Sequence, residues 1–381
     1  MKDTYKVVFA GGGSGGHIYP GIAVADALKT EAEKRGIKIE IYWIGNKTGI
    51  DKSILEKNLV TEGGSITAFY GISCGKLRRY LSFKNFTDMF RIISGYFQSK
   101  KILKKIRPIC LFSKGGFVSV TPCRAAKSLK VPYYTHECDF TPGLATRLNS
   151  KHASKILLSY EETKKFFTAD VEKCTVTGNP VRPIFWEDNS AKGLDFLKID
   201  HGHKKPVLLV IGGSLGASQI NSLVSENLEW LCEHFIVVHQ TGKQWAQEHP
   251  ETFQKASENY KPFEFIYAEM PWVLQASDVV LSRAGANSLW ECAVCEKPML
   301  LIPLCGSGTR GDQVDNAKYL EDKGAAITLI GDKATGDSLK ERLELLTHEE
   351  QRKQLSLSCR KLTGETKSAV TIANIILEGI K

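Results

Sequence analysis

Two similar stretches of the chain decide the fold, namely Val7-Val8-Phe9-Ala10-Gly11-Gly12-Gly13-Ser14-Gly15-Gly16-His17 and Val207-Leu208-Leu209-Val210-Ile211-Gly212-Gly213-Ser214-Leu215-Gly216-Ala217. Each is typical of a buried strand that ends in a glycine turn and leads into a helix. A second pair, Ser113-Lys114-Gly115-Gly116 and Ser282-Arg283-Ala284-Gly285, follows a later strand in each half. The sequence therefore predicts an α/β protein of two Rossmann-like parallel-sheet domains that face each other across a cleft.

Runs rich in Val and Ile alternate with helix-period stretches along the whole chain, which is typical of βα units. The predicted strands are Lys6–Ala10, Ile39–Ile44, Cys110–Ser113, Val131–Thr135, Val207–Ile211, Phe235–His239, Phe263–Tyr267, Val279–Ser282 and Met299–Ile302. We place the N-terminal domain at residues 1–180 and the C-terminal domain at 181–362. A last helix within 363–381 is expected to return to the N-terminal domain.

Composition excludes several classes of protein. The 381 residues are 42% hydrophobic and 24% charged, as in soluble globular proteins, which excludes disorder as the main state. The longest apolar runs fall far short of the roughly 20 residues of a membrane-spanning helix, and the N-terminal apolar run is too short for a signal peptide. We therefore expect a cytoplasmic location. The pair Cys292 and Cys295 lacks the further ligands of a zinc site, so no metal is predicted.

The positive charge is concentrated in one segment. The chain has a net charge of +9, and the stretch Ile72–Cys110 holds ten bases against the single acid Asp88. In the same stretch Phe83, Phe86, Phe90, Ile93 and Phe97 recur at helical spacing. This aromatic stripe either packs on the domain core or docks on an anionic membrane surface together with Lys100, Lys101, Lys104 and Lys105. Nucleic acid is disfavoured because no known binding motif accompanies the charge.

The glycine loops carry the candidate chemistry. Gly11–Gly16 fits a dinucleotide fingerprint, but the strand Ile39–Ile44 is not followed by the acid that would hold a ribose, which disfavours nicotinamide binding. The loop offers close backbone approach and a helix N-terminus that favours an anion, and His17 is placed to transfer a proton. In the second half Ser214 and Arg182 are candidate phosphate ligands, and the polar groups suited to sugar hydroxyls are those of Glu291, Gln313 and Asn316.

The ordered set of motifs resembles the MurG family, the peptidoglycan N-acetylglucosaminyltransferases that convert lipid I to lipid II. The motifs that carry the resemblance are Gly11–Gly21, Lys114–Ser119, His136-Glu137, Pro142–Leu144, Gly178–Arg182, Gly212–Ala217, Thr241–Lys243, Ser282–Ala286, Glu291 and Asp312-Gln313. Against the family pattern, this chain has Cys138 and Asp139 after His136-Glu137, with Thr146 and Leu215 as further departures.

The resemblance implies a GT-B fold and an inverting transfer of N-acetylglucosamine from UDP-N-acetylglucosamine to the C4 hydroxyl of undecaprenyl-diphospho-N-acetylmuramoyl-pentapeptide, with no cofactor and no metal. It implies a peripheral protein on the cytoplasmic face of the cell membrane, bound to the anionic inner leaflet. The expected general base is His17, with Glu137 or Asp139 as alternatives. The implied contacts with the nucleotide sugar are Ser14, Gly15, Gly16, Asp139, Arg182, Ser214, Ile266, Ala286, Asn287, Ser288, Leu289, Glu291, Gln313 and Asn316.

Three other functions remain open at this point. A glycolipid synthase would use the same kind of donor with diacylglycerol as acceptor. A UDP-sugar epimerase would process the donor with no acceptor present. A membrane-bound sensor would bind the nucleotide sugar without turnover.

Overall fold

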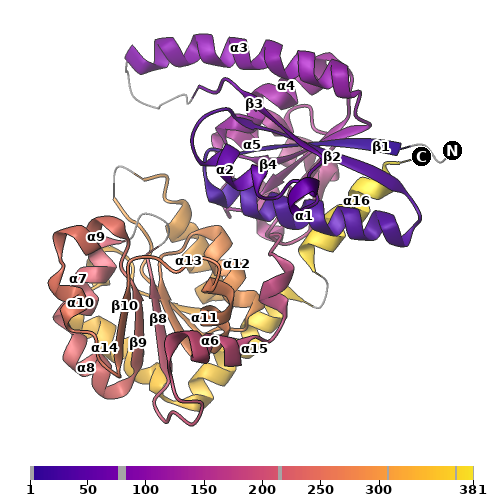
Figure 1. Cartoon of the computed structure of the whole chain (residues 1–381). Coiled ribbons are helices and arrows are strands. Elements are labelled where there is room, and N and C mark those ends of the chain that lie inside the picture. Colours follow the sequence, from indigo (N-terminus) through magenta and orange to yellow (C-terminus); the bar gives the residue numbers. More distant parts are fainter. Residues whose placement is uncertain (1–3, 76–82, 213–216, 307–308, 365–366, 381) are drawn as a thin grey trace. The chain divides into compact units, whose positions relative to one another are not determined.

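The computed structural model describes residues 4–75, 83–212, 217–306, 309–364 and 367–380, and the side chains of 83–85 are not described. The chain forms two compact units. The first comprises Met1–Arg182 and Thr366–Lys381, and the second comprises Pro183–Glu365. Each unit has its own sheet and its own helices (Figure 1).

The first unit is built on a seven-stranded sheet, counted over the described residues, in the order β3-β2-β1-β4-β5-β6-β7. All neighbouring strands are parallel. Its strands are β1 (Thr4–Gly11), β2 (Lys38–Asn46), β3 (Ala68–Ile72), β4 (Cys110–Gly115), β5 (Tyr133–Glu137), β6 (Lys155–Leu158) and β7 (Cys174–Val176). Its helices are α1 (Gly15–Lys34), α2 (Ile50–Glu56), α3 (Phe83–Ile106), α4 (Val120–Ser128), α5 (Leu144–Ser150) and α16 (Ser368–Glu378).

Alternate residues of the central strands pack into two hydrophobic cores, one on each face of the sheet. On β1, Val7 and Phe9 pack with α1 and α16, whereas Val8 and Ala10 pack with α3 and α4. This alternation follows from the pleat of a strand that is covered on both faces. The C-terminal helix α16 packs against α1 and belongs to the same compact unit.

The second unit has a six-stranded parallel sheet, again counted over the described residues, in the order β10-β9-β8-β11-β12-β13. Its strands are β8 (Val207–Ile211), β9 (Ile236–Gln240), β10 (Tyr260–Phe263), β11 (Val279–Ser282), β12 (Met299–Leu301) and β13 (Ala326–Thr328). Its helices are α6 (Ser190–Leu197), α7 (Ser218–Glu226), α8 (Leu228–His234), α9 (Lys243–Glu248), α10 (Glu251–Gln254), α11 (Met270–Ala276), α12 (Ala286–Val294), α13 (Asp312–Asp322), α14 (Gly336–Thr347) and α15 (Glu349–Thr363).

Most predicted strands are confirmed within a few residues. The strand predicted at Phe263–Tyr267 is wrong in position, because β10 ends at Phe263. Four further strands, β3, β6, β7 and β13, were not predicted, and they are only three to five residues long. Strands this short carry too few residues to show a period.

The orientation of α3 shows whether its aromatic stripe packs on the domain core or faces away from it. Its buried face is formed by Asp88, Ser99, Leu103 and Ile106, and the last two join a core cluster. The side chains of the stripe lie on the opposite side, where Phe86 is 68% exposed, Phe90 59%, Ile93 49% and Phe97 62%. The interpretation that this stripe packs on the core is therefore wrong for the described side chains. Phe83 lies outside them.

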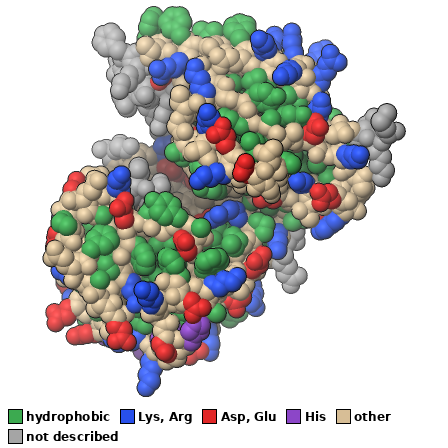
Figure 2. All heavy atoms as spheres, viewed as in Figure 1, with side chains coloured by type: hydrophobic (Ala, Val, Ile, Leu, Met, Phe, Trp, Pro, Cys, Tyr) green, Lys and Arg blue, Asp and Glu red, His purple; other side chains and the backbone are tan. Residues whose placement is uncertain are grey.

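Figure 2 shows hydrophobic and basic side chains gathered on the surface at the top of the view, where Figure 1 places α3. The basic residues Lys101, Lys104 and Lys105 of its C-terminal half are exposed. Exposed apolar patches of this kind mark interaction surfaces. Among the helices in the described ranges, none is both long enough and apolar enough to cross a membrane.

Candidate active site

The first sheet reverses its strand order between β1 and β4, and ligands of doubly wound sheets bind at the carboxyl ends of such neighbouring strands. The glycine loop Gly11–Gly16 follows β1, and Gly115-Gly116 follows on from β4. The register joins the two loops directly, because Gly11 is paired with Gly115. The predicted catalytic loop therefore lies at the topological switch point of this unit.

His17 lies in the first turn of α1, half-buried, and its backbone N–H donates to the carbonyl of Ser14 at 3.1 Å. The second glycine loop makes room for its ring. A Cβ on Gly116 would lie 2.8 Å from His17 Cδ2 and 2.9 Å from the Gly12 carbonyl oxygen, and Gly116 has a φ of +75°. These constraints require glycine at position 116. The two glycine loops and His17 therefore form one packed group.

Glu137 ends β5 and is almost fully buried. Its Oε1 accepts the N–H groups of Cys138 and Asp139 at 2.9 and 3.0 Å, and its Oε2 accepts the N–H of Gly143 at 2.9 Å. Three backbone donors occupy this carboxylate, which favours His17 over Glu137 as the general base. Glu137 instead fixes the backbone that carries Asp139. The catalytic roles of both residues stay predictions.

Two buried side chains near the carboxyl ends of β4 and β5 were not predicted as site residues. His136 and Lys114 are each 1% exposed, and His136 Nε2 donates to the carbonyl of Gly178 at 3.0 Å. Burial lowers the pKa of His136 well below its ordinary range, and the nearby Lys114 ammonium lowers it further. His136 is therefore neutral and orients the loop that contains Gly178. The Lys114 Nζ has no hydrogen-bond partner within the described ranges.

Arg182 belongs to the first unit, where its guanidinium carbon lies 5.2 Å from the centre of the Tyr19 ring. This cation–π contact places Arg182 next to the first turns of α1. The side chain of Ser14 is exposed, and Gly15, Gly16 and Asp139 are half-buried. The first unit therefore brings His17, Arg182 and the glycine loop together, although the assigned contacts with a nucleotide stay predictions.

The second sheet reverses its order between β8 and β11. The loop after β8 contains Ser214 and Leu215, which lie outside the described residues. After β11, Gly285 is the N-cap of α12, and a Cβ there would meet no atom of the described residues within 4 Å.

The predicted ligands of the second unit differ in exposure. On α12, Asn287, Ser288 and Glu291 are half-buried, whereas Ala286 and Leu289 are buried. The N–H of Leu289 donates to the Gly285 carbonyl at 3.1 Å, so the predicted contacts of these two buried residues stay predictions. Ile266 is buried and its N–H donates to Gln240 Oε1 at 2.9 Å.

The two predicted amide ligands hold the protein backbone. Gln313 accepts the N–H of Leu304 at 3.0 Å through its side-chain oxygen. Asn316 is fully buried and donates to the Ala284 carbonyl at 3.2 Å. Asn316 therefore fixes the turn before α12, which favours a positioning role, and its contact with a sugar stays a prediction.

A buried polar network supports β9 in the second unit. His239 is fully buried, with Nε2 against Asn221 Oδ1 at 3.1 Å and Nδ1 against the Tyr260 hydroxyl at 2.9 Å. The Asn221 amide group donates to the Thr241 carbonyl, so its oxygen accepts from Nε2 and the imidazole is neutral. Burial lowers the pKa of His239 to about 3. Gln240, the next residue, holds Ile266, which links this network to the candidate donor site.

This network predicts acid sensitivity of the second unit. The folded pKa of about 3 lies below the ordinary 6.5, so the stability from neutral His239 is complete above about pH 6.5 and is lost as the pH falls from there toward 3. At pH 5 the loss is about 2 kcal/mol. Urea unfolding followed by tryptophan fluorescence measures it, because Trp186, Trp230, Trp245, Trp272 and Trp290 lie in this unit. We expect His239→Gln to reduce the pH dependence between pH 7 and 5; an unchanged slope would refute the assignment.

Among the described residues, one group of side chains is close enough together to hold a metal ion: Glu137, Cys138 and Asp139, with ligand atoms within 4.8 Å of one another. The Glu137 carboxylate already accepts three N–H groups. We therefore assign no metal to this group.

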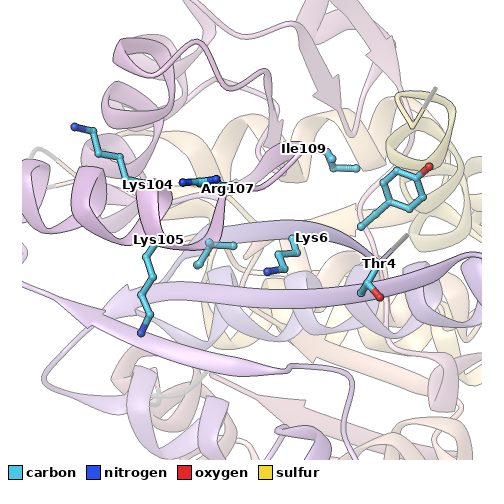
Figure 3. A pocket seen from close by; sticks show the side chains of 8 residues that line it. Thr4, Lys6, Lys104, Lys105, Arg107 and Ile109 are labelled. Carbon is cyan, nitrogen blue, oxygen red and sulfur yellow. The ribbon is translucent and has the colours of Figure 1, made fainter. Parts of the chain in front are cut away.

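A cavity of about 510 Å³ in the first unit lies away from these loops (Figure 3). It is lined by Thr4, Tyr5, Lys6, Lys104, Lys105, Ile106, Arg107 and Ile109. Thr4 begins β1 and Gly11 ends it, so the cavity lies at the end of the sheet opposite His17. The side chains of Lys104 and Lys105 diverge in Figure 3, so they do not converge on one ligand.

Comparison with known proteins fits this geometry. Residues 7–158 match the glycosyltransferase family 28 N-terminal domain, and residues 207–372 match the C-terminal domain of that family. A relative from Treponema denticola is 47% identical over 97% of this chain and 96% of its own length. The chain belongs to glycosyltransferase family 28. The relative is named UDP-N-acetylglucosamine–N-acetylmuramyl-(pentapeptide) pyrophosphoryl-undecaprenol N-acetylglucosamine transferase.

Solved structures show that the family 28 fold is shared more widely. MurG of Acinetobacter baumannii is similar with a TM-score of 0.72 at 22% identity, over 98% of this chain and 99% of that one. A UDP-GlcNAc 2-epimerase from Neisseria meningitidis is similar with a TM-score of 0.67 at 16% identity, over 99% and 100%. At these identities the likeness shows the fold only, so the fold does not separate a transferase from an epimerase.

Proposed function

We propose that this family 28 chain transfers N-acetylglucosamine from UDP-N-acetylglucosamine to the C4 hydroxyl of undecaprenyl-diphospho-N-acetylmuramoyl-pentapeptide, which converts lipid I to lipid II in peptidoglycan synthesis. The observation that carries the proposal is the 47% identity, over 97% of the chain, to a relative named for this transfer. The strand order of both sheets supports it, because each sheet has a switch point and ligands of doubly wound sheets bind at such points.

In this reaction His17 is the general base of the N-terminal unit. Its imidazole takes the proton of the acceptor C4 hydroxyl while that oxygen attacks the anomeric carbon of the donor. The bond from the anomeric carbon to the UDP oxygen breaks, UDP leaves with the electron pair, and the configuration inverts. The contact with the second glycine loop, where Gly116 leaves room for the ring, holds the imidazole in place.

The C-terminal unit binds the donor in this proposal. The N-terminus of α12 and the loop that contains Ser214 receive the diphosphate, because free N–H groups and the helix dipole favour an anion. Glu291 accepts hydrogen bonds from sugar hydroxyls, and the backbone at Ile266 contacts the base. The guanidinium of Arg182 stabilises the negative charge that develops on the leaving UDP.

The exposed stripe on α3 binds the membrane surface that holds the acceptor. Phe86, Phe90, Ile93 and Phe97 insert among the headgroups, and the lysines at the C-terminal half of α3 pair with anionic lipids of the inner leaflet. The protein is then peripheral on the cytoplasmic face of the membrane.

A charge substitution tests this surface. Replacing Lys100, Lys101, Lys104 and Lys105 with Gln is expected to weaken binding to vesicles with anionic lipid by up to about 10³-fold, because each of the four bases contributes about 1 kcal/mol near such a surface. Vesicle sedimentation measures the change. The matched control replaces four exposed lysines of the second unit with Gln, at positions Lys243, Lys255, Lys318 and Lys333. Equal binding of the two variants would refute the role of α3.

An acceptor panel separates the proposed reaction from its alternatives. UDP release from UDP-N-acetylglucosamine is measured with a lipid I analogue, with diacylglycerol and with no acceptor. We expect release with the lipid I analogue and background release in the other two. Release with diacylglycerol would favour a glycolipid synthase, and change of the donor with no acceptor would favour an epimerase. Donor binding without any turnover would favour a sensor.

A further inference from the structure

Asp51 is a buried carboxylate that ties the first glycine loop to the neighbouring strand. It lies in the first turn of α2 and is 1% exposed. Its Oδ1 accepts the N–H of Gly13 at 2.8 Å, and its Oδ2 accepts the N–H of Asn46, the last residue of β2, at 2.8 Å. Both oxygens are therefore occupied by backbone donors from two different segments.

Glycines form the space that this carboxylate fills. A Cβ on Gly12 would overlap Asp51 Oδ2, and a Cβ on Gly45 would lie 3.3 Å from the same atom. Gly13 has a φ of +85°, and a Cβ there would overlap the ring of Phe117. A side chain at position 12 is incompatible with Asp51 in this place, so these glycines serve the protein's own carboxylate as well as any ligand.

The N–H groups of a glycine loop between a strand and a helix commonly bind the phosphates of a ligand. In this chain the N–H of Gly13 is taken by Asp51. We propose that Asp51 is a positioning residue that acts as a built-in anion: it holds the glycine loop in its working conformation before substrate binds and thereby sets the position of His17. This inference rests on the proposed function, in which His17 is the base.

A few residues of the glycine loop connect the Gly13 N–H, which Asp51 accepts, to His17. Gly13 precedes Ser14, whose carbonyl accepts the N–H of His17 at 3.1 Å. A Cβ on Gly11, at the start of the loop, would lie 3.1 Å from the His17 carbonyl oxygen. Movement at Gly13 is therefore transmitted to the first turn of α1, which carries the imidazole.

Asp51 accepts the Gly13 N–H, which is therefore not available to a ligand while Asp51 holds it.

Asp51→Asn in the full chain tests the proposal. The amide keeps one acceptor oxygen and presents an NH₂ group to the other backbone N–H, so one of the two contacts is lost. We expect kcat to fall by about tenfold or more, while KM for UDP-N-acetylglucosamine changes by less than about twofold. The matched control is Asp26→Asn, which changes an acid of α1 whose carboxylate accepts the Ser65 hydroxyl.

Amide hydrogen exchange separates a role in positioning the glycine loop from a role in the stability of the whole N-terminal unit. In Asp51→Asn we expect faster amide exchange confined to residues 11–17, with the rest of the N-terminal unit exchanging as in the wild type. The melting temperature should fall by no more than the few degrees that one lost buried hydrogen bond costs. Faster exchange across the whole N-terminal unit would overturn the proposal, as would unchanged kcat. Should the variant not fold, exchange in the wild-type protein decides: a protected Gly13 amide supports the contact, and an unprotected one refutes it.

These outcomes are distinguishable from failure of the proposed function. If the wild-type chain transfers no sugar to the lipid I analogue, the proposed function fails. The exchange of residues 11–17 then still shows whether Asp51 holds the loop, because it is measured without substrate.

Discussion

Replacing His17 with Ala is expected to lower kcat by about 10² to 10⁴-fold, the usual contribution of a positioned general base. The affinity for UDP-N-acetylglucosamine should change by less than about twofold, because His17 belongs to the unit to which we assign the acceptor. Steady-state kinetics with saturating acceptor, together with calorimetric titration of the donor, separate the two effects.

The matched control for this substitution is His152→Ala, which removes an exposed histidine from the same unit. We expect it to leave kcat unchanged. If His17→Ala retains wild-type kcat, His17 is not the base. If it loses donor affinity in proportion to kcat, His17 binds substrate instead of transferring a proton.

Replacing Glu291 with Ala is expected to raise KM for UDP-N-acetylglucosamine by about 100-fold. A carboxylate that accepts two sugar hydroxyls contributes about 1.5 to 3 kcal/mol for each charge-assisted bond, part of which water recovers in the variant. Glu291 lies half-buried on α12, the helix whose N-cap is Gly285. Initial rates over a range of donor concentrations measure the effect.

The control for Glu291 is Glu229→Ala, an exposed acid on α8 of the same unit. Its KM should remain that of the wild type. A Glu291 variant with unchanged KM and unchanged kcat would remove this residue from the donor site.

Much of the fold was predictable because the central strands are buried on both faces. Such strands are continuous apolar runs, as in Val207–Ile211, and the glycine turns that follow them mark the carboxyl ends where ligands bind. The edge strands were missed because three to five residues show no period. The aromatic stripe was recognised as one helical face, but a sequence does not show which face of an amphipathic helix is covered.

Site residues that belong to a recognisable sequence motif could be predicted. Site residues that only tertiary contacts bring together could not. His17 follows a glycine loop, so its position in sequence indicates its role. Asp51 is 38 residues from Gly13, and nothing around it in the sequence marks it as the partner of the loop. His136 and Lys114 are likewise placed side by side only by the pairing of β4 with β5.

The identity of the product is the most direct test of the proposed transfer. The full chain is incubated with UDP-N-acetylglucosamine and a lipid I analogue, and the lipid product is analysed by mass spectrometry and by the anomeric coupling in its NMR spectrum. We predict one added N-acetylhexosamine on the muramoyl C4 hydroxyl, with inverted configuration and one UDP released for each sugar transferred. An unmodified lipid I analogue, or a product with retained configuration, would contradict the account.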